Sequence, residues 1–246
     1  MAEVRLPKRI MNSGGWCQGC GHGVVVRLIA EVLDELGVAD RTIAVEDVAC
    51  GSMSMSGVLN CDAIMAAHGR PIPVANGAKG ARPDSIVYAH LGDGSAYSIG
   101  CAELVHTALR GDNMTVIVVN NTVYGMTGGQ MAPTTLPGQI TQTTPYGRNP
   151  DVEGFPVRVC EMLSTLSGVA LAERVTVIDP KNINIAKKAI RKGFEFQKNK
   201  QGFSIIEVLS TCPTNWGKTP IEALDRVRTE MIPYYPLGVF KEGAIR

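Results

Sequence analysis

Residues 86–94 read IVYAHLGDG and residues 115–121 read TVIVVNN, and these two stretches decide the fold. Each begins with a short run of mainly apolar residues, which is typical of a buried β-strand. The residues between them predict a helix over about 97–110. Strand, helix and strand in succession form a βαβ unit with parallel strands. Asp93 and Asn121 would then share the sheet edge at which α/β proteins bind ligands.

The same alternation continues along the chain. It predicts an α/β fold, a mostly parallel central sheet with helices on both faces. We expect one domain over residues 1–246, with a cysteine-bearing segment at about 12–23, an irregular segment at about 124–156 and a C-terminal extension at about 213–246. Further helices are predicted at 22–36 and 182–198, and further strands at 42–46, 175–178 and 203–208.

Length and composition exclude several classes of protein. A chain of 246 residues suits one domain, and 45% hydrophobic with 19% charged residues argues against disorder. A net charge of +1 without basic blocks gives no reason to expect nucleic acid or a membrane surface as partner. With no long apolar run and no signal-like N-terminus, we expect a cytoplasmic protein. Its seven cysteines would there be thiols or metal ligands.

Two segments have unusual composition. Residues 124–156 are rich in Thr, Gly, Gln and Pro without helical or strand periodicity, so we expect them to cover a ligand or a partner chain. The C-terminal stretch 231–246, MIPYYPLGVFKEGAIR, is aromatic and apolar for a tail. It could form a strand that closes its own domain, but we expect it to pack on a partner.

The GDG loop and the double asparagine suggest a metal and diphosphate site. The oxygens of Asp93 and Asn121 suit a hard cation such as Mg²⁺. Gly92 and Gly94 would let a diphosphate approach the backbone at a helix N-terminus. An ordinary strand–turn–helix with Asp93 as N-cap is the simpler alternative for GDG alone.

Four cysteines form a second candidate site. The segment 16–23, WCQGCGHG, holds a CxxC pair that could be a redox pair, a zinc half-site or an iron–sulfur half-site. Cys50 and Cys212 each follow a predicted strand, so they belong to the same sheet edge. A structural zinc site with all four thiolates remains an alternative. Cys101 is expected in the core, whereas Cys61 and Cys160 receive no role.

These motifs together carry a family resemblance. GDG followed by NN after residues 95–119 resembles the thiamine diphosphate motif, and NNTVYGMTGGQ at 120–130 resembles the β subunit of 2-oxoacid:ferredoxin oxidoreductases. WCxGCG, HGR at 68–70 and CPT at 212–214 fit the same family. The resemblance implies the diphosphate-binding fold of thiamine enzymes over nearly the whole chain.

The resemblance also implies site residues. Mg²⁺ would be held by Asp93, the side chain of Asn121 and the carbonyl of Val123. A [4Fe–4S] cluster would be held by Cys17, Cys20, Cys50 and Cys212. Thiamine diphosphate would be contacted by Val48, Ala49, Cys50, Gly51, His68, Gly92, Gly94, Ser95, Tyr124, Gly125 and Met126. Two positions depart from the family pattern, Ser95 where an Asp is common and Gly128 where some members have Lys.

The activity implied is coenzyme A-dependent oxidative decarboxylation of a 2-oxoacid, reversible, with electrons passed through the cluster to ferredoxin. Since 246 residues leave little room for a second domain, we expect the pyrimidine-binding domain of such enzymes to lie outside this chain. We therefore expect an α subunit to supply the catalytic Glu, in an (αβ)₂ or larger assembly that can include a ferredoxin-like subunit. The motifs favour 2-oxoglutarate or a branched-chain 2-oxoacid over pyruvate, with Arg70, Arg148 and Arg158 as candidate cations for a distal carboxylate.

Other classes make different predictions. A non-redox thiamine-dependent decarboxylase or carboligase subunit would need no iron. A non-catalytic electron-transfer or zinc-structured module would bind no thiamine. Rossmann-type NAD binding is disfavoured because the glycines of GDGSAYSIG have the wrong spacing.

Overall fold

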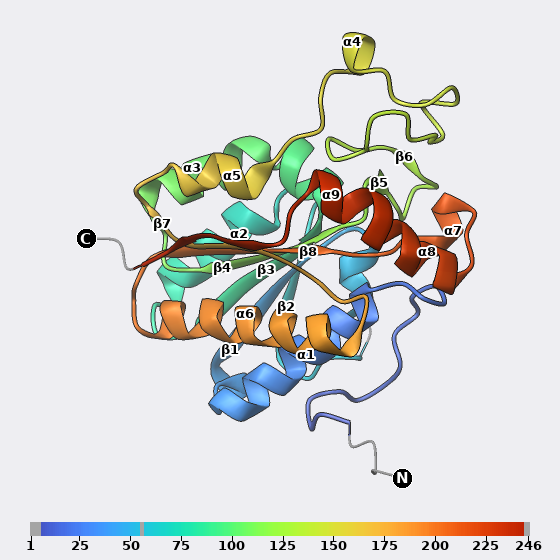
Figure 1. Ribbon diagram of the computed structural model, residues 1–246. Helices are drawn as coiled ribbons and strands as arrows, with labels where there is room; N and C mark the ends of the chain where they lie inside the picture. Colours follow the sequence, from blue (N-terminus) through green and yellow to red (C-terminus); the bar gives the residue numbers. More distant parts are fainter. Residues whose placement is uncertain (1–5, 55–56, 244–246) are drawn as a thin grey trace.

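A seven-stranded sheet forms the centre of the computed structural model, which describes residues 6–54 and 57–243 (Figure 1). Its strand order is β2-β1-β3-β4-β8-β7-β9, and every neighbouring pair is parallel except β7 with β9. The strands are β1 (Thr42–Asp47), β2 (Asp62–Ala66), β3 (Ile86–Gly92), β4 (Thr115–Asn120), β7 (Val169–Thr176), β8 (Phe203–Leu209) and β9 (Gly238–Glu242). The predicted fold class is confirmed.

Helices cover both faces of the sheet (Figure 1). Helices α1 and α6 pack on one face, and α2, α3 and α5 pack on the other. The helices are α1 (His22–Leu36), α2 (Pro71–Ala81), α3 (Cys101–Arg110), α4 (Pro150–Glu153), α5 (Val159–Ser164), α6 (Pro180–Lys198), α7 (Pro213–Trp216), α8 (Pro220–Arg226) and α9 (Ile232–Tyr234). None in the described part of the chain is long and apolar enough to span a bilayer.

Local signals set the ends of the two longest helices. α1 ends at Gly37, whose φ of 62° is a left-handed conformation that glycine adopts without steric cost. α6 begins after Asp179, whose side chain accepts a hydrogen bond from the backbone N–H of Asn182. Both helices lie at the predicted positions, because the apolar periodicity and the end residues of each helix indicate the same boundaries.

Two elements differ from their predicted bounds. The helix expected at about 97–110 consists of a π-helical turn, Ser95–Ile99, a break at Gly100, and α3. The strand expected at 175–178 spans 169–176 instead. Its first part contains Glu173 and Arg174, which look like surface residues in the sequence. Arg174 is fully buried because it pairs with Glu207 of β8 and Glu161 of α5.

The two segments of unusual composition have different outcomes. Residues 124–156 are irregular as predicted, apart from the small hairpin β5 (Val123–Tyr124) with β6 (Gln130–Met131) and the single turn α4. The part around α4 extends away from the sheet (Figure 1). The tail forms the strand that closes its own domain, because β9 joins the sheet and Tyr235 is fully buried. Packing of the tail on a partner stays a prediction. Residues 244–246 of the tail lie outside the described part.

Candidate cofactor site

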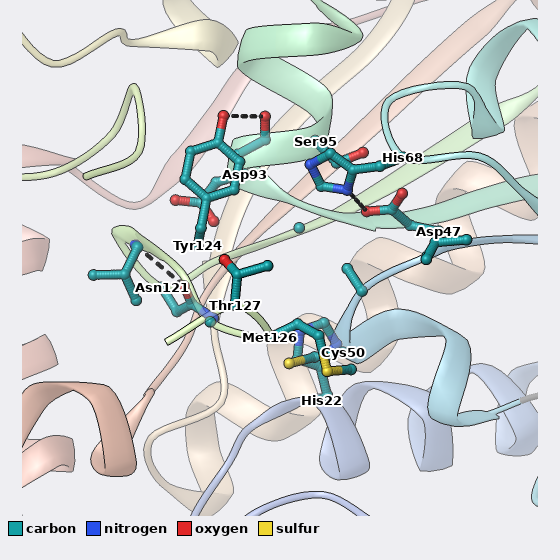
Figure 2. Close-up of a pocket in the computed structure, with 16 residues that line it drawn as sticks. His22, Asp47, Cys50, His68, Asp93, Ser95, Asn121, Tyr124, Met126 and Thr127 are labelled. Carbon is teal, nitrogen blue, oxygen red and sulfur yellow. Dashed lines mark hydrogen bonds and ion pairs between the residues drawn. The ribbon is translucent and has the colours of Figure 1, made fainter. Parts of the chain in front are cut away.

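The carboxyl ends of β1, β3 and β4 surround a cavity of about 290 Å³ (Figure 2). Its walls come from the three strand ends, from the loop after β2, from the start of α1 and from the segment after β4. Of the residues predicted to contact thiamine diphosphate, all except Gly51 line it. Gly51 lies behind this wall, where a Cβ atom would come within 3.2 Å of the His90 carbonyl oxygen. The cavity residues are His22, Asp47, Val48, Ala49, Cys50, His68, Gly92, Asp93, Gly94, Ser95, Asn121, Val123, Tyr124, Gly125, Met126 and Thr127.

Asp93 is the buried carboxylate of this cavity. Its side chain is 1% exposed and accepts a hydrogen bond from the hydroxyl of Thr134, in the irregular segment. Burial raises the pKa of Asp93 to about 7. A cation bound here would compensate the charge, so this carboxylate fits the predicted Mg²⁺ ligand. Thr134 thus brings the irregular segment into contact with a residue of the cavity lining.

The turn after β4 presents Asn121 and Val123 to the same cavity. Between them, Thr122 has a φ of 62°, which is unusual for a β-branched residue. The turn is held on both sides. The Thr122 N–H donates to Oδ1 of Asn120, while the Thr122 carbonyl accepts a hydrogen bond of 2.6 Å from the Thr135 hydroxyl. The strained backbone of Thr122 is thus held by a side chain at the end of β4 and by a side chain of the irregular segment.

A buried ion pair between β7 and β8 supports this turn. Nδ2 of Asn120 donates to Oε1 of Glu207 at 2.8 Å, and the other oxygen of Glu207 accepts from Nε of Arg174 at 2.6 Å. All three side chains are fully buried. Paired with each other and hydrogen-bonded to their neighbours, Glu207 and Arg174 can remain charged in the interior.

His68 and Tyr124 face each other across the mouth of the cavity (Figure 2). Nδ1 of His68 lies 3.3 Å from Oδ2 of the buried Asp47. The hydroxyl of Tyr124 donates to the carbonyl of Gly94 at 3.2 Å. A Cβ atom on Gly94 would lie 2.4 Å from the Tyr124 ring, so the close approach of this ring requires glycine. An imidazole in this position can donate a hydrogen bond to a phosphate group.

A chain of buried polar side chains also reaches the cavity, and sequence reasoning missed it. Nδ1 of His22 lies 3.3 Å from Nε2 of His90, and Nδ1 of His90 lies 2.8 Å from Oε2 of Glu46. Burial lowers the pKa of His22 well below its usual value. The only available signal was its position directly after the cysteine pair.

The four predicted cluster cysteines line a second cavity of about 270 Å³. It adjoins the first, because Cys50, Asn121, Gly125 and Met126 belong to both linings. A Cβ atom on Gly125 would lie 3.6 Å from the sulfur atoms of both Cys50 and Cys212, so both thiols face this residue. Burial raises the pKa of Cys20 to about 12 and that of Cys50 to about 11.

The other cysteines lie elsewhere. Cys160 is buried with its thiol 3.4 Å from Glu207, and Cys61 is half-buried. Cys101, expected in the core, is half-exposed at the start of α3. None of the seven forms a disulfide. Within 6–54 and 57–243, no three His, Cys, Asp or Glu side chains are gathered as the ligands of a single metal ion.

The three arginines considered for a substrate carboxylate have other partners. Arg70 pairs with Glu103, and Arg158 donates to the carbonyl of Tyr234. Arg148 is buried and binds loop carbonyls, including that of Thr135 at 2.6 Å. None of them lines the first cavity.

Comparison with known proteins defines the class. Residues 47–208 match the family model described as "Thiamine pyrophosphate enzyme, C-terminal TPP binding domain". The fold also matches a solved structure titled 2-oxoglutarate:ferredoxin oxidoreductase from Magnetococcus marinus with 2-oxoglutarate, coenzyme A and succinyl-CoA bound. The TM-score is 0.80 at 23% identity, covering 100% of this chain and 87% of that one. The chain therefore has the fold of a thiamine diphosphate-binding domain.

Proteins with similar sequences identify a smaller group within this class of thiamine diphosphate-binding domains. The ketoisovalerate oxidoreductase subunit VorA of Methanothermobacter thermautotrophicus is 41% identical over 227 residues, which are 92% of this chain and 47% of that protein. The 2-oxoglutarate synthase subunit KorB of Methanocaldococcus jannaschii is 38% identical over 219 residues, 89% of this chain and 74% of KorB. The chain spans about half the length of the VorA relatives. It belongs to the thiamine pyrophosphate enzyme family, among the subunits of 2-oxoacid oxidoreductases.

Proposed function

We propose that this chain is the β subunit of a coenzyme A-dependent 2-oxoacid:ferredoxin oxidoreductase. The reaction converts a 2-oxoacid, coenzyme A and two oxidised ferredoxins to acyl-coenzyme A, CO₂, a proton and two reduced ferredoxins, and it is reversible. One observation carries the proposal: the cavity of the GDG and NN motifs shares Cys50 with a cavity lined by four cysteines. Such adjacent sites suit a cofactor that is oxidised by a neighbouring cluster.

The first cavity fits thiamine diphosphate with Mg²⁺. Asp93, the side chain of Asn121 and the carbonyl of Val123 would hold the cation. Gly94, Ser95 and His68 would contact the diphosphate, with the remaining cavity residues around the thiazolium. When bound, thiamine diphosphate supplies the nucleophilic carbon that attacks the oxo group and allows CO₂ to leave. The protein's part is to bind, orient and shield it.

The second cavity fits a [4Fe–4S] cluster. Cys17, Cys20, Cys50 and Cys212 would be its ligands. The thiolate form is the ligand, so cluster assembly would have to overcome the raised pKa of Cys20 and Cys50. The cluster would accept electrons one at a time from the thiamine site and pass them to ferredoxin.

A partner chain completes the site. We propose that an α subunit supplies the glutamate that activates the aminopyrimidine ring, in an (αβ)₂ or larger assembly. Two apolar residues of the cavity lining are well exposed, Val48 at 51% and Met126 at 47%. Ile99, which lies beside Gly69, is 49% exposed. The irregular segment exposes four more, namely Ile140, Tyr146, Val152 and Phe155. Apolar surface of this kind is typical of a protein interface.

The substrate is a branched-chain 2-oxoacid or 2-oxoglutarate. Val48 and Met126 give the cavity an apolar wall, which suits a branched chain. The relatives named above include one of each specificity. A 2-oxoglutarate enzyme would need a cation for the distal carboxylate, and in this assembly that cation would come from the partner.

An activity assay tests this proposal. The tagged chain is purified without oxygen from its source organism with the chains that accompany it, and reduction of ferredoxin is followed with 2-oxoisovalerate, 2-oxoglutarate and pyruvate. We expect reduction that requires both a 2-oxoacid and coenzyme A, fastest with 2-oxoisovalerate or 2-oxoglutarate. CO₂ release that needs neither coenzyme A nor an electron acceptor would instead identify a non-redox decarboxylase.

A further inference from the structure

We propose that Asn215 is a positioning residue that joins the cluster site to the thiamine site, through hydrogen bonds from its side-chain amide to Cys212 and to the Gly125 carbonyl. This inference rests on the proposed function, because it assigns a role at both proposed cofactor sites. Asn215 lies in α7, the turn that follows Cys212, and it lines the second cavity.

The two hydrogen bonds fix the orientation of the amide. Nδ2 of Asn215 lies 2.8 Å from the carbonyl oxygen of Gly125 and 3.2 Å from the sulfur of Cys212. A carbonyl oxygen and a thiolate are both acceptors, so only the NH₂ group of the amide can face them. One side chain therefore donates to a cluster ligand and to the loop that lines both cavities.

Packing holds Asn215 in this place. A Cβ atom on Gly129 would lie 2.9 Å from Cβ of Asn215, so the loop after β5 lies directly against it. Gly129 has a φ of 91°, which favours glycine independently. The Asn215 amide is thus confined between this loop and the turn that follows Cys212. A flexible side chain on the surface would lack such fixed partners.

The next residue makes a parallel contact to the metal-binding turn. Nε1 of Trp216 donates to the carbonyl of Asn121 at 3.2 Å. The guanidinium of Arg226 covers the Trp216 ring at 4.1 Å and restrains it. α7 therefore touches both sites, through Asn215 at the cluster cavity and through Trp216 at the proposed Mg²⁺ turn.

These contacts predict two separable effects. A hydrogen bond donated to a ligating sulfur stabilises the more negative, reduced cluster and raises its reduction potential. The bond to Gly125 fixes the loop that would line the thiamine cofactor. Loss of Asn215 should therefore change both the cluster potential and the affinity for thiamine diphosphate. Loss of the Trp216 N–H should change only the affinity.

The test compares variants of the complex purified without oxygen. Asn215→Leu keeps the branched shape of the side chain and removes its donors. Trp216→Phe removes one donor, and Asn199→Leu is a remote control at the exposed end of α6. The cluster midpoint potential is measured by an EPR-monitored redox titration, and the dissociation constant of thiamine diphosphate with Mg²⁺ by calorimetry.

We expect Asn215→Leu to shift the midpoint potential to a more negative value and to raise the dissociation constant roughly 2- to 10-fold, the usual effect of one hydrogen bond. Trp216→Phe should raise the dissociation constant at unchanged potential, and Asn199→Leu should change neither. The EPR titration reports only loaded clusters, so partial loss of iron does not obscure the potential. If Asn215→Leu holds no cluster, Asn215→Ala, which also lacks the N–H donors and adds no charge beside the sulfur, replaces it.

A wild-type potential in the Asn215 variant would overturn the inference and leave Asn215 a purely structural residue. An unchanged dissociation constant would overturn the link to the thiamine site. Failure of the proposed function looks different, because the unmodified complex would then bind no thiamine diphosphate or hold no cluster.

Discussion

Asp93 is the residue on which the thiamine site depends most. Replacing it by Asn keeps the size of the side chain and an acceptor for Thr134 but removes the charge that would hold Mg²⁺. We expect Asp93→Asn to weaken Mg²⁺-dependent binding of thiamine diphosphate on the order of 100-fold or more. Unfolding of the cofactor-free chain should change by less than about 1 kcal/mol, because burying this charge is itself unfavourable.

Calorimetry with thiamine diphosphate and Mg²⁺, together with denaturant unfolding, checks both parts of this prediction. Asp112→Asn is the matched control, since Asp112 pairs with Arg110 at the surface, away from the cavity. Affinity in Asp93→Asn equal to that of the unmodified chain would contradict the Mg²⁺ assignment.

Among single residues, those that lie within or directly beside a recognisable motif could be predicted from the sequence. Asp93, Asn121 and the four cysteines could be found because each follows a strand or belongs to a short pattern. The His22–His90–Glu46 chain could not, because its members come from three distant segments that meet only in the fold. Asn215 stood beside a recognised motif, but nothing in the sequence showed that its amide points at Cys212.

At the scale of the element, α6 offers a test of how a local signal fixes a helix. The Asp179 carboxylate accepts from the N–H of Asn182 at 2.9 Å and so satisfies one free donor of the first turn. We expect Asp179→Ala to lower the free energy of unfolding by about 1 kcal/mol. Lys188→Ala, on the exposed side of the same helix, should change it by less than about 0.5 kcal/mol.

Urea denaturation of the two variants beside the unmodified chain measures the difference. Equal stability of Asp179→Ala and Lys188→Ala would mean that the cap does not fix the start of α6.

The elements that the sequence predicted well share one property. Helices α1 and α6 and strands β3, β4 and β8 combine a clear apolar pattern with an end signal. β7 was placed too late because its buried charges break that pattern. β2 was missed because this edge strand has mostly exposed residues. Pairing with β1, and not a clear apolar pattern of its own, holds this segment as a strand.

The whole molecule depends on a buried charge cluster that sequence patterns conceal. The fully buried Arg174 joins β7 to Glu207 of β8, to Glu161 of α5 and to the carbonyl of Pro236 in the C-terminal segment. Arg174→Met would leave Glu207 as a buried charge without its partner. We expect a loss of about 3–5 kcal/mol in the free energy of unfolding.

Chemical denaturation measures this loss, with Arg110→Met at a surface pair as the control, expected to cost less than about 1 kcal/mol. The double variant Arg174→Met with Glu207→Gln should recover part of the loss, because it also removes the unpaired charge. A single variant as stable as the control would contradict a central role for this cluster.

The proposed function requires that one chain hold a [4Fe–4S] cluster beside a thiamine site. It is tested most directly by iron and acid-labile sulfide in the chain purified without oxygen, as unmodified protein and as Cys212→Ser. We predict about four iron and four sulfide per chain, with most of both lost in the variant. Zinc in place of iron, or no metal in protein kept free of oxygen, would contradict the proposed function.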